Sequence, residues 1–238
     1  MVVTANLLQT FSTNALQGGT GDGDERAFSS MKVALSSPLN STFLRPGSFL
    51  AVIILSDEDD FSDETRPEAS WLRAGGVPDH DYADPNLDTV DSYVSFLDGL
   101  TNSSATVKNY NVSAVTVLDN NCLAAHRLQS PSTIIGQRYM DLATKTNGVQ
   151  ADICSASYAT ALTQIQQKIL ELSTQFVLNR VPVQSSIVVT VGGTVVPNDP
   201  ANGWTYNSTA NSIVFHGTAV PASGASISIV FDPVAPTS

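Results

Sequence analysis

The sequence is poor in basic side chains. Its 238 residues include 11 lysines and arginines against 22 aspartates and glutamates, a net charge of −11. Because nucleic-acid binding needs clustered basic residues, we expect no nucleic-acid partner and favour a cation or a basic partner. Long apolar runs are also missing: the longest, Phe49 to Leu55, has the length of a strand, so we expect no membrane span. The N-terminus has no basic flank and no apolar h-region, so no signal peptide is visible.

Cysteine is scarce as well. Cys122 and Cys154 are the only two, and they form neither a Cys-x-x-Cys nor a metal-finger spacing. They are either two buried free thiols or one disulfide, which would close a loop of roughly 30 residues and contribute about 3 kcal/mol. We favour the disulfide, because low charge, scarce lysine and abundant serine, threonine and asparagine are typical of a secreted protein. The expected location is therefore extracytoplasmic, whether secreted, periplasmic or at the cell surface.

Groups for nucleophilic catalysis are few. The three histidines, His80, His126 and His216, have no obvious partner in the sequence, and a Gly-x-Ser-x-Gly elbow is absent. Aromatic residues make up only 7%, which does not suggest a sugar-binding groove beside the carboxylates. We therefore expect a protein that is not an enzyme. A hydrolase that uses carboxylates is the least favoured alternative.

Apolar residues, at 42%, suffice for a core, and their pattern divides the chain in two. Residues 1–180 alternate between strand-like and helix-like apolar patterns. Strands are expected at 49–55, 112–118 and 149–153, and helices at 24–35, 90–100, 134–146 and 155–178. Such alternation predicts an α/β domain, a parallel sheet with helices on both faces. Three strands are few for such a sheet.

Residues 181–238 show no helical period. Ser186 to Val196 predicts a hairpin that turns at Gly192 and Gly193, and further strands are expected at 203–206, 212–216 and 225–231. We therefore expect a small all-β, sandwich-like module after the α/β domain.

The densest chemical feature is an acidic segment, residues 57–64, with six carboxylates in eight residues directly after an apolar strand. Ligands of open α/β sheets bind at the carboxyl ends of strands, and grouped carboxylates repel one another unless a cation is present. The segment therefore predicts a site for a hard metal ion, although it lacks the glycine of an EF-hand loop. The alternative is a solvated acidic loop. A glycine-rich loop at 18–25 is a second, weaker source of oxygen ligands.

Residues 49–57 resemble the central strand and following aspartate of von Willebrand factor type A domains. Gly18-Gly19-Thr20 is similar to that family's threonine loop, and residues 139–148 resemble its Leu-Ala-x-x-Thr-Gly helix end. The resemblance covers residues about 5 to 178 and implies a Rossmann-like domain. With the two cysteines and the β-module, the chain looks like a secreted or surface-anchored bacterial variant.

The resemblance also implies a metal-ion-dependent adhesion site. In the family, Mg²⁺ or Mn²⁺ at this site takes an acidic group of a partner protein in its open position. Carried over by position, Thr20 and Asp57 are ligands, while Asp22, Glu58 and Asp60 lie nearby without a family counterpart. The family's Asp-x-Ser-x-Ser motif does not occur in the sequence, so the chain resembles the C-terminal part of the domain with a degenerate site.

These observations together predict an extracytoplasmic adhesion protein that engages an acidic group of a partner protein through Mg²⁺, Mn²⁺ or Ca²⁺. The alternative is a structural or assembly subunit, in which Ca²⁺ only orders the acidic loop and the contacts lie on the β-module. An adhesive site would accept Mg²⁺ or Mn²⁺ and keep one position open. A structural site would be closed and prefer Ca²⁺.

Overall fold

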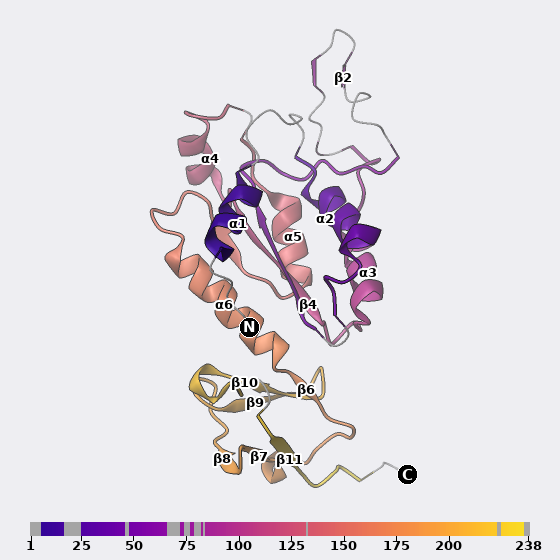
Figure 1. The fold of residues 1–238 in the computed structure, drawn as a ribbon, viewed down its shortest axis with the longest axis vertical. Helices are drawn as coiled ribbons and strands as arrows, with labels where there is room; N and C mark the ends of the chain where they lie inside the picture. Colours follow the sequence, from indigo (N-terminus) through magenta and orange to yellow (C-terminus); the bar gives the residue numbers. More distant parts are fainter. Residues whose placement is uncertain are drawn as a thin grey trace.

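The computed structural model describes residues 6–16, 25–45, 48–65, 72–73, 77–78, 82, 84–131, 133–222 and 225–235. An α/β part and an all-β part follow one another along the long axis (Figure 1). The α/β part contains α1 (Leu7–Ala15), α2 (Ala27–Ser36), η1 (Pro38–Asn40), β1 (Leu50–Leu55), β2 (Leu72–Arg73), β3 (Val77–Pro78), α3 (Val90–Thr101), β4 (Tyr110–Thr116), α4 (Asn120–His126), α5 (Gln137–Lys145), β5 (Gln150–Asp152) and α6 (Ala159–Ser173). The all-β part contains β6 (Phe176–Val177), η3 (Gln184–Ser186), β7 (Val188–Val191), β8 (Thr194–Val196), β9 (Trp204–Asn207), β10 (Ser212–Phe215), η4 (Gly217–Ala219) and β11 (Ile227–Val230).

The α/β part is built on a parallel sheet with the strand order β1-β4-β5. β4 is buried along its whole length and forms the centre of this sheet. β1 is the outer strand among the strands described, and its two faces differ: Leu50 and Ile54 are buried, whereas Leu55 is 67% exposed. The expected α/β class is therefore confirmed, with all three expected strands present.

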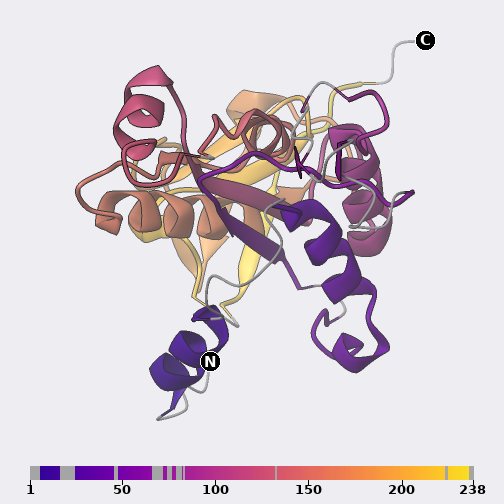
Figure 2. The same ribbon diagram turned by 90° about the horizontal axis from the view of Figure 1, so that it is seen from above.

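Helices cover both faces of this sheet, which Figure 2 shows from above. α2, α3 and α5 pack on one face through Phe28, Tyr93, Leu97, Tyr139 and Leu142, against the inward side chains of β1 and β4. α6 packs on the other face, where Ala161 and Ile165 meet Val115 and Ala151. The helical stripes expected from the sequence thus account for the main core. In the described part of the chain, no helix is long and apolar enough to cross a membrane.

The last helix is shorter than the sequence pattern predicts. It was expected to run from 155 to 178, but α6 covers only Ala159–Ser173. Phe176 instead begins β6, which pairs with β10, and Leu178 lies in the core of the all-β part. A short period-3.6 pattern cannot distinguish a helix end from a strand that belongs to the next core.

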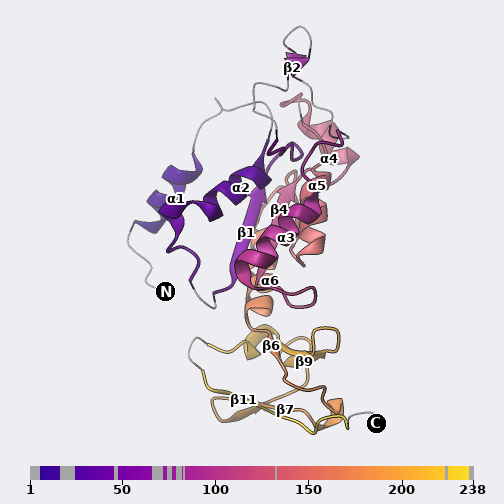
Figure 3. The ribbon, with the colours of Figure 1, turned by 90° about the vertical axis from the view of Figure 1, so that its right-hand side faces the viewer.

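The all-β part consists of two antiparallel three-stranded sheets, ordered β6-β10-β9 and β11-β7-β8. They share one core, which includes Val189, Trp204, Ile213 and Phe215. The expected hairpin is present, since both Gly192 (φ 57°) and Gly193 (φ 84°) adopt the left-handed conformation that its tight turn requires. Figure 3 shows this sandwich-like module beyond the lower end of α6.

Candidate functional site

The acidic segment follows β1 at the carboxyl edge of the parallel sheet, and most of it is buried. The relative exposures are 7% for Glu58, 4% for Asp59, 0% for Asp60 and 3% for Asp63. A solvated acidic loop, the alternative considered from sequence, therefore does not describe these residues. Buried carboxylates need hydrogen bonds or counter-charges, because transfer of a bare charge out of water is very costly. Their partners define what each of them can do.

Asp60 holds the beginning of α2. Its Oδ1 accepts hydrogen bonds from the backbone N–H of Phe28 (3.0 Å) and from the hydroxyl of Ser62 (2.9 Å). Its Oδ2 accepts from the backbone N–H of Ser62 (3.1 Å) and lies 3.3 Å from Nη2 of Arg138. Arg26, the residue before α2, gives no side-chain cap, so Asp60 supplies one from 32 residues away. Burial raises the pKa of Asp60, although these donors favour its charged form.

Asp59 holds the beginning of α5 in the same way. Its Oδ1 accepts from the backbone N–H of Asp60 and from that of Arg138 in the first turn of α5, both at 2.9 Å. A carboxylate is favoured at this position because the N-terminal end of a helix carries a partial positive charge. Burial nevertheless dominates and raises the pKa of Asp59 to about 6. Two of the acidic side chains thus cap two helices, a role that local sequence patterns do not reveal.

Asp57 is different, because it faces solvent. Its side chain is 33% exposed, and its Oδ2 lies 3.5 Å from the hydroxyl of Thr133 and 3.7 Å from Nδ1 of His126. Glu25 belongs to the same acidic surroundings. The pKa of its carboxyl is raised first by burial and then by the negative charges of Glu58, Asp57 and Asp60. Negative charge therefore gathers at this edge, where a cation would relieve the repulsion.

The candidate ligands from the sequence are only partly brought together. Asp57, Glu58 and Asp60 share one short segment, but both oxygens of Asp60 are already engaged by protein donors. Thr20 and Asp22 lie outside the described residues. An oxygen donor set led by Asp57 fits a hard cation in chemical type, with few ligands from the described part of the chain.

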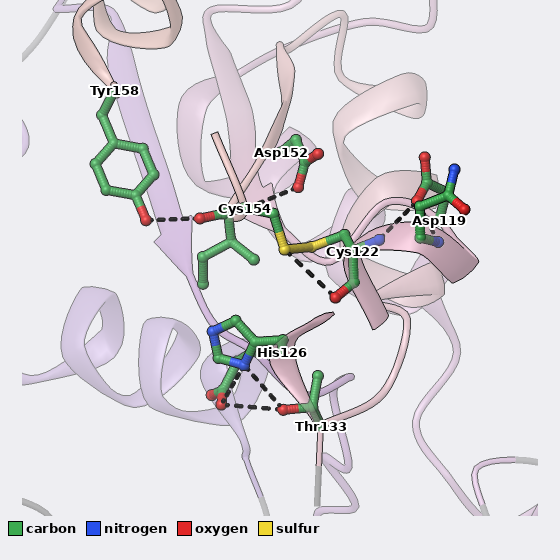
Figure 4. Close-up of a disulfide and its surroundings, with 10 residues drawn as sticks. Asp119, Cys122, His126, Thr133, Asp152, Cys154 and Tyr158 are labelled. Carbon is green, nitrogen blue, oxygen red and sulfur yellow. Dashed lines mark hydrogen bonds and ion pairs between the residues drawn. A yellow bond between two sulfur atoms is a disulfide. The ribbon is translucent and has the colours of Figure 1, made fainter. Parts of the chain in front are cut away.

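Sequence reasoning missed His126 and Thr133, which stand beside Asp57 but 69 and 76 residues away in the chain. Figure 4 shows the imidazole of His126 next to the hydroxyl of Thr133. The sequence feature that could have placed His126 near Asp57 is the position of each residue after a strand. α4, which ends at His126, follows β4, and β4 pairs in parallel with β1, so the segments after both strands meet at one edge.

Cys122 and Cys154 form a disulfide with a Cα–Cα distance of 5.6 Å, as favoured from the sequence. It joins α4 to the segment that follows β5 (Figure 4). Asp152 lies close enough that its carboxylate and the two sulfurs are within 4.8 Å of one another. In the disulfide the sulfurs carry no thiolate charge, so this group would need reduction before it could bind a metal well. The bond instead fixes the helix that carries His126.

A sizeable hollow lies elsewhere in the described part of the chain. It has a volume of about 510 Å³ and is lined by residues near the start of β1, the end of α3 and the end of α6, including Arg45, Phe49, Leu100, Lys108 and Leu172. Its Lys108 is paired with Asp98 at 2.6 Å. It holds no group of clear chemical function, so the carboxyl edge of the sheet is the better candidate site.

Comparison with protein-family models gives no match for this chain, and a search of curated proteins gives none either. The fold establishes the class: a mixed α/β protein with a three-stranded parallel sheet between helices and two antiparallel sheets after it. Its function has to be argued from the site.

Proposed function

We propose that this chain is an extracytoplasmic binding protein that engages an acidic group of a partner protein through a divalent cation at the carboxyl edge of β1. Asp57 carries this proposal. Its carboxylate reaches solvent, at 33% exposure, beside other negative charges, whereas Asp59 and Asp60 are buried. The order of strands and helices, which resembles part of a von Willebrand factor type A domain, supports the same interpretation. So does the disulfide, which is compatible with an oxidising compartment.

In this proposal Asp57 supplies the exposed oxygen ligand. Glu58, and Thr20 and Asp22 from the glycine-rich loop, are the further candidate ligands that the sequence predicts. Asp59 and Asp60 keep the edge in place by capping α5 and α2. A cation held by few protein ligands keeps open positions, which water or a partner carboxylate can fill.

Calorimetric titration with Mg²⁺, Mn²⁺ and Ca²⁺ tests the proposal. We expect binding to the wild type and its loss in Asp57→Ala. Asp141→Ala, which removes an exposed carboxylate of α5, is the matched control and should bind as the wild type does. If titration of the wild type with divalent cations gives no heat of binding and the cations do not change its melting temperature, the proposal is wrong.

A second candidate, an assembly subunit with its contacts on the all-β module, is favoured by a different observation. Val188, Val195 and Val230 are 47%, 66% and 65% exposed, and the strand register places them on one face of the sheet β11-β7-β8. Val188 and Val230 are direct cross-strand neighbours. An apolar face of this kind suits a protein contact. If Val230→Lys abolishes association of the chain while cations have no effect, this candidate replaces the first.

A further inference from the structure

The starting point is where two chain segments meet. Asp57 follows β1, and His126 ends α4, the helix after β4. Because Leu55 of β1 is paired with Val115 of β4 in a parallel register, both strands end at the same edge of the sheet. A ligand at this edge can therefore contact both segments.

The contacts at this point bring together three different donor types. Nδ1 of His126 lies 3.1 Å from the hydroxyl oxygen of Thr133 and 3.7 Å from Oδ2 of Asp57. The hydroxyl of Thr133 lies 3.5 Å from the same carboxylate oxygen. The side chains of His126 and Asp57 are 30% and 33% exposed, whereas Thr133 is fully buried. One imidazole nitrogen, one carboxylate and one hydroxyl thus face one another, and the first two are accessible to solvent.

These separations are close to what a bound metal ion would need. Two ligand atoms, each about 2.1 Å from a metal, lie roughly 3.0–3.4 Å apart in octahedral or tetrahedral geometry. The 3.7 Å between Nδ1 and Oδ2 has to shorten by only a few tenths of an ångström. Both side chains are exposed enough to make this adjustment.

We propose that Asp57 and His126, with the hydroxyl of Thr133 beside them, form a mixed nitrogen–oxygen site that selects Zn²⁺ or Mn²⁺ over Mg²⁺ and Ca²⁺. This inference rests on the proposed function and names the cation that its site takes. Imidazole nitrogen suits zinc and other transition-metal ions, whereas Mg²⁺ and Ca²⁺ are bound by oxygen ligands. Zn²⁺ is expected to bind more tightly than Mn²⁺ to such a donor set.

The disulfide contributes by positioning the imidazole. Cys122 lies four residues before His126 in the same short helix and is 4% exposed, and its bond to Cys154 ties α4 to the segment after β5. Asp119 holds the other end of α4, accepting from the backbone N–H groups of Asn121 (2.8 Å) and Cys122 (2.9 Å). His126 therefore approaches Asp57 from a fastened helix.

The chain offers a matched control. In the all-β module, Nε2 of His216 lies 2.7 Å from the hydroxyl of Thr205, much as His126 lies beside Thr133. Within the described part of the chain, the histidine whose ring nitrogen lies within 4 Å of a carboxylate oxygen is His126. His216→Gln therefore removes a histidine bonded to threonine without touching the proposed donor set. His80→Gln covers the third histidine, which lies outside the described residues.

The experiment is calorimetric titration of the full oxidised chain with Zn²⁺, Mn²⁺, Mg²⁺ and Ca²⁺, with Co²⁺ absorption in the visible range as a second readout. The wild type should bind Zn²⁺ about 100-fold more tightly than Ca²⁺. His126→Gln should lower the affinity for Zn²⁺ at least about tenfold and change the affinity for Ca²⁺ by less than about threefold. It should also alter the absorption spectrum of bound Co²⁺. Asp57→Asn should weaken the binding of all four cations. His216→Gln and His80→Gln should match the wild type, and metal-free thermal melts verify that each variant is folded.

Two results overturn the inference. One is equal affinity for Zn²⁺ and Mg²⁺ in the wild type; the other is unchanged Zn²⁺ binding in His126→Gln. Either result leaves the proposed function standing as long as cations bind and Asp57→Asn abolishes that binding. Failure of the proposed function looks different, because then no cation binds to the wild type at all.

Discussion

Replacing Asp60 tests most directly which carboxylates of the acidic segment stabilise the fold and which bind a cation. The hypothesis from the sequence includes it among metal ligands, whereas its contacts indicate a structural role. Asp60→Asn replaces a carboxylate that accepts from Phe28, from two groups of Ser62 and from Arg138 at 0% exposure. The variant leaves Arg138 without its buried counter-charge and directs an amide N–H₂ group at existing donors.

Removing one partner of a buried, hydrogen-bonded ion pair costs about 3–5 kcal/mol. The raised pKa of Asp60 shows that burial already disfavours its charge, so we expect the lower end, about 3 kcal/mol. That is a large part of the 5–15 kcal/mol typical of a folded domain. α2 should be affected most, because Asp60 caps its first turn.

The assay is urea unfolding followed by circular dichroism, in the presence of a chelator so that cation binding does not contribute. Asp57→Asn is the control and should change the free energy of unfolding by less than about 1 kcal/mol, because its side chain is exposed and its contacts are long. If Asp60→Asn instead keeps wild-type stability in chelator and loses cation binding, Asp60 is a ligand and the structural assignment is refuted.

Three further outcomes are expected. Replacing Cys122 and Cys154 by serine should lower the free energy of unfolding in urea titrations by roughly 3–4 kcal/mol, because the disulfide closes a loop between cysteines 32 residues apart and so restricts the unfolded chain. An unchanged urea midpoint would contradict this. Because the pKa of Asp59 is raised to about 6 from 3.8, its contribution to stability is full below about pH 4 and is lost as pH rises through 6, a span of up to about 3 kcal/mol. The difference in the free energy of unfolding between the wild type and Asp59→Asn, measured from pH 4 to 7, should fall as the pH rises. A difference that does not change with pH would argue against this. Gly148→Ala should lower the melting temperature sharply, since its Cβ would fall 1.8 Å from the carbonyl oxygen of Val112; a wild-type melt would mean that the backbone moves apart easily.

The sequence alone predicts the local elements well. The strand at Leu50–Leu55, the helix at Val90–Thr101 and the Gly192-Gly193 hairpin follow from apolar periodicity and turn chemistry, which act over a few residues. The disulfide was also favoured from the sequence, because the low charge, scarce lysine and abundant serine, threonine and asparagine are typical of a secreted protein.

The sequence also determined that negative charge gathers after β1, but not what each carboxylate does there. Tertiary structure decided that Asp59 and Asp60 accept from first-turn N–H groups 79 and 32 residues away, respectively, and that Asp57 stays partly exposed. It also placed His126 beside Asp57 and moved Phe176 from the expected helix into the core of the β-module. The physical reason is the same in each case: periodicity records which side chains avoid water, whereas hydrogen bonds and charges act between atoms that only the packed chain brings together.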